Sequence, residues 1–163
     1  MIKKEINIAF EDFGSIEELN QSDKNLCLEA VKAMENSHSP YSKFKVGVVV
    51  KLASGKIVYG SNQENVAYPS GLCAERVALF TVGANYPDDK IISIAITAKT
   101  EQFELLKPVT PCGACLQVIA EYEQKQKDEV EVLLYCIDGA IWKTKGVKSF
   151  LPFMFVEDRL GIG

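Results

Sequence analysis

Two short segments hold the side chains with the most distinctive chemistry in this chain. The first reads Cys73-Ala74-Glu75-Arg76 and the second reads Pro111-Cys112-Gly113-Ala114-Cys115. Cys112 and Cys115 are three positions apart, so in the first turn of a helix they lie on one face and can share a metal ion. Cys73 would supply a third thiolate from the start of a neighbouring helix. Three protein ligands leave the fourth tetrahedral position of a zinc ion open, which is the arrangement of a catalytic zinc site.

The residues after Cys73 predict how such a site would work. A zinc ion lowers the pKa of the water that it binds and so makes a nucleophile available near neutral pH. Glu75 is expected to take the proton of that water and to deliver it to the reacting group. Three thiolates overcompensate the charge of zinc, which weakens its effect on the water. Arg76 is therefore expected to donate hydrogen bonds to the ligand sulfurs and to offset their charge.

Bulk composition limits the other possibilities. The chain has 163 residues, a net charge of −4 and 47% hydrophobic residues, which is typical of one soluble domain. Acidic residues are spread out and no basic stripe is present, so a small-molecule partner is favoured over a nucleic acid. No apolar run reaches the length of a membrane span or of a secretory signal, so no membrane partner and a cytoplasmic location are expected. In a reducing cytosol the five cysteines would not form disulfides.

The pattern of apolar residues predicts an α/β fold with helices on both faces of one mixed sheet. Residues 1–21 read as an N-terminal extension in which Ile6, Ile8 and Phe10 indicate either an edge strand or a tail. Residues 22–163 read as a single domain whose first helix begins at a cap near Ser22-Asp23. Its expected helices cover residues 22–36, 73–83, 112–123 and, as a short final turn, 148–151. Its five expected strands cover residues 46–51, 56–60, 91–98, 130–136 and 141–144.

Taken together, the cysteine segments form the pattern Cys-x-Glu … Pro-Cys-x-x-Cys, a cysteine version of a known zinc deaminase signature. The chain resembles cytidine deaminases of the small, homotetrameric type over residues 39–155. The segments that carry the resemblance, besides residues 111–115, are Ser39 to Phe44, Gly60 to Asn65, Tyr68 to Arg76, and Leu151-Pro152 with Phe155. The sequence departs from the family pattern at Lys45, Gln63, Val66 and Phe153-Met154.

The resemblance implies a three-layer α/β/α sandwich with a central mixed five-stranded sheet, one Zn²⁺ per subunit, and hydrolytic deamination of cytidine and deoxycytidine in pyrimidine salvage. It implies that Asn62 and Glu64 hydrogen-bond the ribose, that Phe44 packs against the nucleoside, and that the backbone N–H of Ala74 holds the base carbonyl. In the family the sites lie at subunit interfaces of a homotetramer, with a homodimer as the alternative. The residues expected to reach into a neighbouring subunit's pocket are Tyr68 and Phe155.

Three other interpretations remain open at this stage. Cys112 and Cys115 could form half of a structural zinc site completed by Cys27, Cys136 or His38. The substrate could be a base within a nucleic acid or a modified nucleoside, although base-editing relatives commonly carry His where this chain has Cys73. The chain could also be a zinc-stabilised binding module without catalysis, which would require a closed site with four protein ligands.

Overall fold

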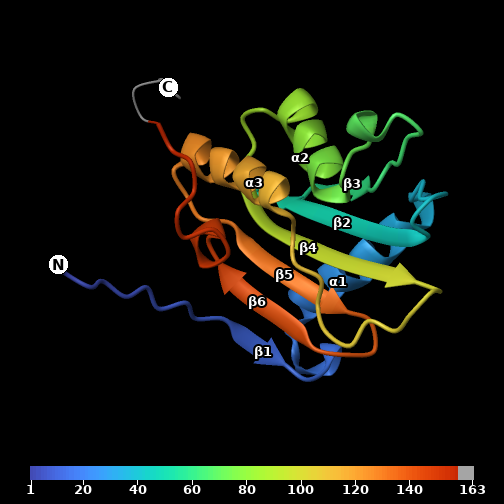
Figure 1. The fold of residues 1–163 in the computed structure, drawn as a ribbon, viewed down its shortest axis with the longest axis horizontal. Helices are drawn as coiled ribbons and strands as arrows, with labels where there is room; N and C mark the ends of the chain where they lie inside the picture. The colour runs from blue at the N-terminus through green and yellow to red at the C-terminus, as the bar shows by residue number, and fades with distance from the viewer. Residues whose placement is uncertain (158–163) are drawn as a thin grey trace.

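A six-stranded mixed sheet runs through the middle of the computed structural model, which describes residues 1–157 (Figure 1). The strand order is β1-β6-β5-β4-β2-β3, in which β4 and β5 are parallel and all other neighbours are antiparallel. The strands are β1 (Glu11–Phe13), β2 (Phe44–Leu52), β3 (Ile57–Ser61), β4 (Ile91–Thr100), β5 (Glu131–Cys136) and β6 (Ile141–Lys145).

Helices cover both faces of this sheet, which confirms the expected three layers. α1 (Gln21–Ala33) lies behind the sheet, whereas α2 (Ala74–Asn85) and α3 (Gly113–Gln126) lie on the opposite face (Figure 1). One apolar core fills the space under α2 and α3, with Leu79 and Ile119 fully buried between the helices and the sheet. A second core, which includes Ala30 and Val49, lies between α1 and the other face. None of the helices among residues 1–157 is long and apolar enough to cross a bilayer.

The sheet has one strand more than the five expected from the sequence. The additional strand, β1, pairs antiparallel with β6, so that Glu11 lies opposite Lys143 and Phe13 opposite Ile141. Of the two possibilities open for Ile6 to Phe10, an edge strand or a tail, the strand is absent, since residues 1–10 form no strand and β1 begins at Glu11. Phe10 nevertheless packs its ring against Trp142 at a centroid distance of 5.4 Å. The N-terminal segment is thus joined to the sheet edge from Phe10 onward.

The first helix also begins earlier than the sequence indicated. Its cap is Asn20, whose Oδ1 accepts a hydrogen bond from the N–H of Asp23 at 3.0 Å, and not Ser22 or Asp23. Asp23 is buried and instead forms an ion pair with Lys143 of β6 at 2.7 Å. The side-chain amide of Asn20 also donates to Oδ2 of Asp23 at 2.8 Å, so these two side chains bond to each other at the start of the helix.

Candidate metal centre and substrate pocket

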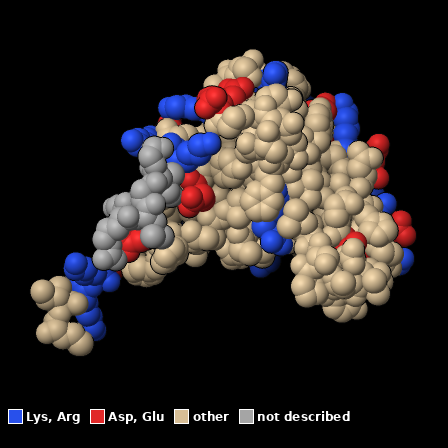
Figure 2. Space-filling model, turned by 90° about the horizontal axis from the view of Figure 1, so that it is seen from above, with Lys and Arg blue, Asp and Glu red and all other residues tan. Residues whose placement is uncertain are grey.

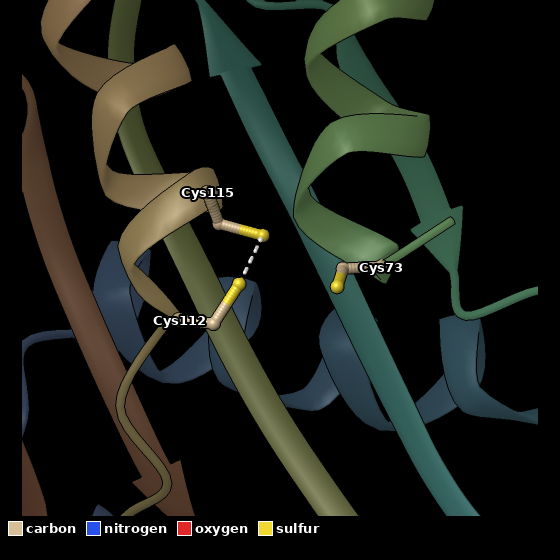
Figure 3. A group of neighbouring side chains, drawn as sticks. All are labelled: Cys73, Cys112 and Cys115. Atoms are coloured by element: carbon tan, nitrogen blue, oxygen red, sulfur yellow. Dashed lines mark hydrogen bonds between the residues drawn. The ribbon is translucent and has the colours of Figure 1, made fainter. Parts of the chain in front are cut away.

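Three cysteine thiols meet on the face of the sheet that carries α2 and α3. The sulfurs of Cys73, Cys112 and Cys115 all lie within 4.8 Å of one another (Figure 3). Cys112 and Cys115 are 3.4 Å apart and come from one helix start, whereas Cys73 faces them from the start of the neighbouring helix. Thiolates are preferred zinc ligands, and three of them leave one tetrahedral position for water or substrate. The cluster therefore fits one zinc ion per chain.

Sheet topology explains why residues so distant in sequence meet here. β3 and β4 are both antiparallel to β2 and so point in the same direction. The carboxyl ends of β3 and β4 therefore lie on the same side of the sheet, at the ends of the strands. α2 follows β3, and α3 follows β4. Cys73 and Cys112 are the N-cap residues of these two helices. The positive ends of both helix dipoles are therefore directed at the sulfur cluster, which favours thiolate over thiol.

Hydrogen bonds within the cluster further stabilise negative charge on Cys73. Its pKa is lowered to about 5, chiefly because it accepts a hydrogen bond from the Cys115 thiol and also because Arg76 lies beside it. The pKa of Cys115 is raised, since that thiol acts as the donor to Cys73 and is buried. Nη2 of Arg76 donates to Sγ of Cys73 at 3.6 Å. The geometry thus brings Arg76 to a ligand sulfur, as expected from the sequence.

Arg76 reaches Cys73 through Nη2, whereas its Nε is buried and has no hydrogen-bond partner among residues 1–157. One further feature of this cluster matches the chemistry of a hydrolytic site. Glu75 is only 5% exposed, and burial raises the pKa of its carboxyl group. A carboxyl group with a raised pKa next to Cys73 and Cys115 is suited to accept and return a proton.

A pocket of about 600 Å³ opens directly beside Cys73 and Arg76. Asn62 and Glu64 line it, so the two residues expected to bind a ribose do face one pocket. The pocket wall also contains Tyr68, which was expected in a neighbouring subunit's pocket. The remaining wall residues, which had no predicted role, are Tyr41, Ser42, Gln63, Asn65, Gly71 and Leu72.

Asn62 is held rigidly by the start of β2. Its Oδ1 accepts a hydrogen bond from the N–H of Val46 at 2.9 Å and from the hydroxyl of Ser37 at 2.6 Å, while its Nδ2 donates to the carbonyl of Phe44 at 2.9 Å. These contacts use most of the hydrogen-bonding capacity of the amide. Asn62 therefore shapes this wall of the pocket and keeps at most one N–H for a ligand.

Glu64 is fixed by a tight turn in the neighbouring segment. Its Oε2 accepts hydrogen bonds from the backbone N–H groups of Tyr41 at 2.9 Å and Ser42 at 3.2 Å. The pKa of Glu64 is lowered, mainly by a hydrogen bond from the Ser42 side chain, which favours its charged form. Tyr41 and Ser42 lie in a segment that carries the family resemblance but had no predicted role. Their backbone contacts carry no residue-type signal, which is why only the structure shows them.

The remaining expected site residues are not all brought together in one chain. Ala74 is buried at the first position of α2, where its N–H has no acceptor within the helix. Phe44 lies outside the pocket wall and contacts Phe103, with ring centroids 6.3 Å apart. Tyr68 lines this chain's own pocket and is 76% exposed. Phe155 is 70% exposed and lies elsewhere, tied to α3 through two hydrogen bonds between its backbone and Gln117.

Comparison with known proteins agrees with this geometry. The family model of the cytidine and deoxycytidylate deaminase zinc-binding region matches residues 20–127. The cytidine deaminase of Halalkalibacterium halodurans is 42% identical over 135 residues, which is 83% of this chain and 95% of that relative. The cytidine deaminase of Sporosarcina psychrophila is 39% identical over 138 residues, covering 84% of this chain and 93% of that protein.

The fold has matching relatives among solved structures. The crystal structure of cytidine deaminase from Burkholderia pseudomallei superimposes with a TM-score of 0.70 at 35% sequence identity, covering 84% of this chain and 100% of that one. All three cysteines and Glu75 lie within the range matched by the family model. The chain therefore belongs to the zinc-dependent cytidine and deoxycytidylate deaminase family, an enzyme family of hydrolytic deaminases.

Proposed function

We propose that this chain converts cytidine and deoxycytidine, with one water molecule, into uridine and deoxyuridine plus ammonia, as a step of pyrimidine salvage. One observation carries the proposal. The buried carboxyl group of Glu75 adjoins a three-thiol metal centre at one end of a pocket, and a charged Glu64 lies in the wall of the same pocket. The first pair provides the means to activate water, and Glu64 provides an acceptor for sugar hydroxyl groups.

In this proposal the residues of the chain move protons and position the base. Zinc, when bound, supplies the Lewis acid that makes water a nucleophile toward C4 of cytosine. Glu75 accepts one proton from that water and passes it to the ring nitrogen N3. It then takes the proton of the new C4 hydroxyl and delivers it to the amino group, which leaves as ammonia as the C4 carbonyl forms. The N–H of Ala74 holds the carbonyl oxygen of the base, because the first N–H groups of a helix lack internal acceptors. Arg76 offsets the negative charge of the sulfur ligands.

The sugar would occupy the other end of the pocket. Glu64 accepts a hydrogen bond from the ribose 3′-hydroxyl, and Asn62 donates its remaining N–H to the same group. Phe44, which lies outside the wall of this pocket, would have to turn from Phe103 toward it to pack against the nucleoside. A pocket of about 600 Å³ is large enough for a nucleoside. The absence of a required 2′-hydroxyl contact in this scheme lets cytidine and deoxycytidine share the site.

We also propose that the chain assembles into a cytoplasmic homotetramer, with residues 22–163 as the catalytic domain and residues 1–21 as an extension. Seen from above, most charged side chains of the α2 and α3 side lie toward its margin and uncharged ones fill much of its centre (Figure 2). A groove of about 420 Å³ there is lined in part by Phe80 and Val118. Exposed apolar surface of this kind supports contact with further copies, through which Tyr68 and Phe155 would reach a neighbour's pocket. A homodimer would bury part of the same surface.

The decisive experiment follows ultraviolet absorbance and ammonia release when the purified chain is incubated with cytidine, deoxycytidine, dCMP, adenosine or a short oligonucleotide. Turnover of cytidine and deoxycytidine is expected, and a chelator should abolish it until zinc is returned. Turnover of the oligonucleotide without turnover of cytidine would overturn the proposal. Light scattering coupled to size exclusion should give the mass of four chains, and a stable monomer with full activity would contradict the assembly.

A further inference from the structure

A second pocket, of about 670 Å³, lies on the other face of the sheet from the metal centre. Gly47 faces α1, because a Cβ at that position would meet the backbone of Ala30 and the side chain of Met34. Side chains two positions apart in a strand point to the same face, so Lys45 also points away from α2 and α3. The pocket opens where β4 ends and β2 begins, near the arrowhead of β4 in Figure 1.

Three lysines line this pocket without any partner of opposite charge. Lys45 of β2 lies directly opposite Lys99 of β4 in the strand register, and Lys43 precedes them in the turn. Among residues 1–157, none of the three takes part in an ion pair. Glu101 is the single carboxylate in the wall, which leaves a formal charge of +2 from the charged side chains that line the pocket.

This arrangement of charge costs stability in the empty pocket. Like charges directly opposite each other on neighbouring strands repel. Lys43 also adopts a left-handed backbone conformation with φ of +54°, which is unfavourable for a residue with a side chain. The turn is nevertheless fixed, since the N–H of Lys43 donates to the carbonyl of Ser39 at 3.0 Å. A bound anion would relieve the repulsion between Lys45 and Lys99.

The rest of the wall offers donors suited to a phosphate group. Ser39 and His38 line the pocket together with the lysines, adding a hydroxyl group and an imidazole. Lysine ammonium groups and hydroxyl donors are the common ligands of phosphate oxygens in proteins. We propose that this pocket, defined by Lys43, Lys45 and Lys99, binds a small anion that carries phosphate groups.

The segment that would hold the anion also supports the pocket beside the metal centre. Ser37 donates its hydroxyl to Oδ1 of Asn62 at 2.6 Å, and the N–H of His38 donates to the carbonyl of Asn62 at 3.0 Å. The N–H of Glu64 in turn donates to the carbonyl of His38 at 2.8 Å. Ser37 and His38, which line the lysine pocket, are therefore hydrogen-bonded to Asn62 and Glu64, which line the pocket beside the metal centre.

Calorimetric titration of the zinc-loaded, full-length chain with inorganic pyrophosphate at low salt tests this proposal without relying on any enzymatic activity. Saturable binding at one site per chain is expected. The double variant Lys45→Gln/Lys99→Gln should bind about tenfold more weakly or worse, since two charged donors are lost. The matched control Lys3→Gln/Lys4→Gln removes the same charge from the exposed N-terminal segment and should bind like the unmodified chain.

Two readouts separate the lysine pocket from other sources of binding. Pyrophosphate held by the zinc ion would bind the double lysine variant unchanged, and that result would overturn the proposal. If the Lys3→Gln/Lys4→Gln control bound pyrophosphate as weakly as the double variant, net charge alone would explain the loss of affinity. That result would also overturn the proposal. Pyrophosphate should raise the melting temperature of the unmodified chain and not that of Lys45→Gln/Lys99→Gln. The single variant Lys99→Gln, with an intermediate loss of affinity, provides a second test with less change to the sheet.

Discussion

Gly60 of β3 lies so close to Ala74 at the start of α2 that a Cβ on the glycine would be 2.4 Å from the Ala74 carbonyl oxygen. It would also meet the backbone nitrogen and the Cβ of Ala78 at 2.7 and 2.8 Å. The first turn of α2, which carries Cys73 and Glu75 to the metal centre, therefore rests directly on the strand. Only a residue without a side chain allows this approach.

Gly60→Ala should consequently displace the start of α2. Overpacking of this kind costs about 1–3 kcal/mol, and urea denaturation should show the loss. Zinc affinity should fall with it, because Cys73 would move relative to Cys112. Gly113→Ala is the matched control, since a Cβ there meets nothing within 4 Å. Equal stability of Gly60→Ala and the unmodified chain would show that the contact is not tight in solution.

Glu75→Gln should separate metal binding from proton transfer. The amide keeps the shape of the carboxyl group but cannot accept the proton of water, so deamination should fall by roughly 10²–10⁴-fold. Zinc content measured by atomic absorption should stay near one ion per chain, because the ligands are the three cysteines. A variant that retains normal turnover would exclude Glu75 as the proton carrier.

Replacing Arg76 should affect the metal more than the fold. Arg76→Gln removes the hydrogen bond to Cys73 and the positive charge beside the sulfur cluster. Loss of such a contact typically weakens metal binding about 10–100-fold, which competition with a chromogenic chelator would measure. Glu64→Gln lies in the same pocket without touching the sulfurs and should bind zinc as before. If Arg76→Gln bound zinc as tightly as the unmodified chain, Arg76 would not stabilise the sulfur ligands.

The two residues proposed to bind the sugar should respond differently to mutation. Asn62→Ala leaves the N–H of Val46 and the carbonyl of Phe44 without their partner, so a loss of about 1–3 kcal/mol of stability is expected along with activity. Glu64→Gln should leave stability unchanged and raise KM for cytidine about tenfold with little change in kcat. A normal KM in Glu64→Gln would place the ribose elsewhere.

Removal of residues 1–13 should expose the edge of the sheet. β1 has three residues, two of them acidic, and it covers the longer β6. Short, charged edge strands protect a sheet against pairing with other molecules. The shortened chain should aggregate on heating at a lower temperature than the full chain, as followed by light scattering. Deletion of residues 1–9 alone keeps β1 and should have little effect.

The metal centre could be predicted from the sequence because cysteine type and spacing specify it locally. Helices and strands with a strong apolar period, such as those that became α2, α3 and β4, were found within a few residues of their observed ends. β1 was misplaced because the sequence Glu11-Asp12-Phe13 has no strand pattern, and only its pairing with β6, some 130 residues away, makes it a strand.

The start of α1 shows the same limitation. Asn20, Ser22 and Asp23 are all residue types that cap helices. Asn20 is the cap in the structure, whereas Asp23 lies in the first turn and pairs with Lys143, which is remote in sequence. The lysine pocket was missed for a similar reason, because Lys45 and Lys99 become neighbours only through the register of β2 and β4.

The three sulfurs that meet over the sheet belong to two separate helices, Cys73 to one and Cys112 with Cys115 to the other. A shared ion would therefore cross-link α2 and α3. Ligands that bind only the native state stabilise it by an amount that grows with the logarithm of their free concentration above Kd. The concentration of free zinc would then determine the resistance of the protein to proteolysis as well as its rate of deamination.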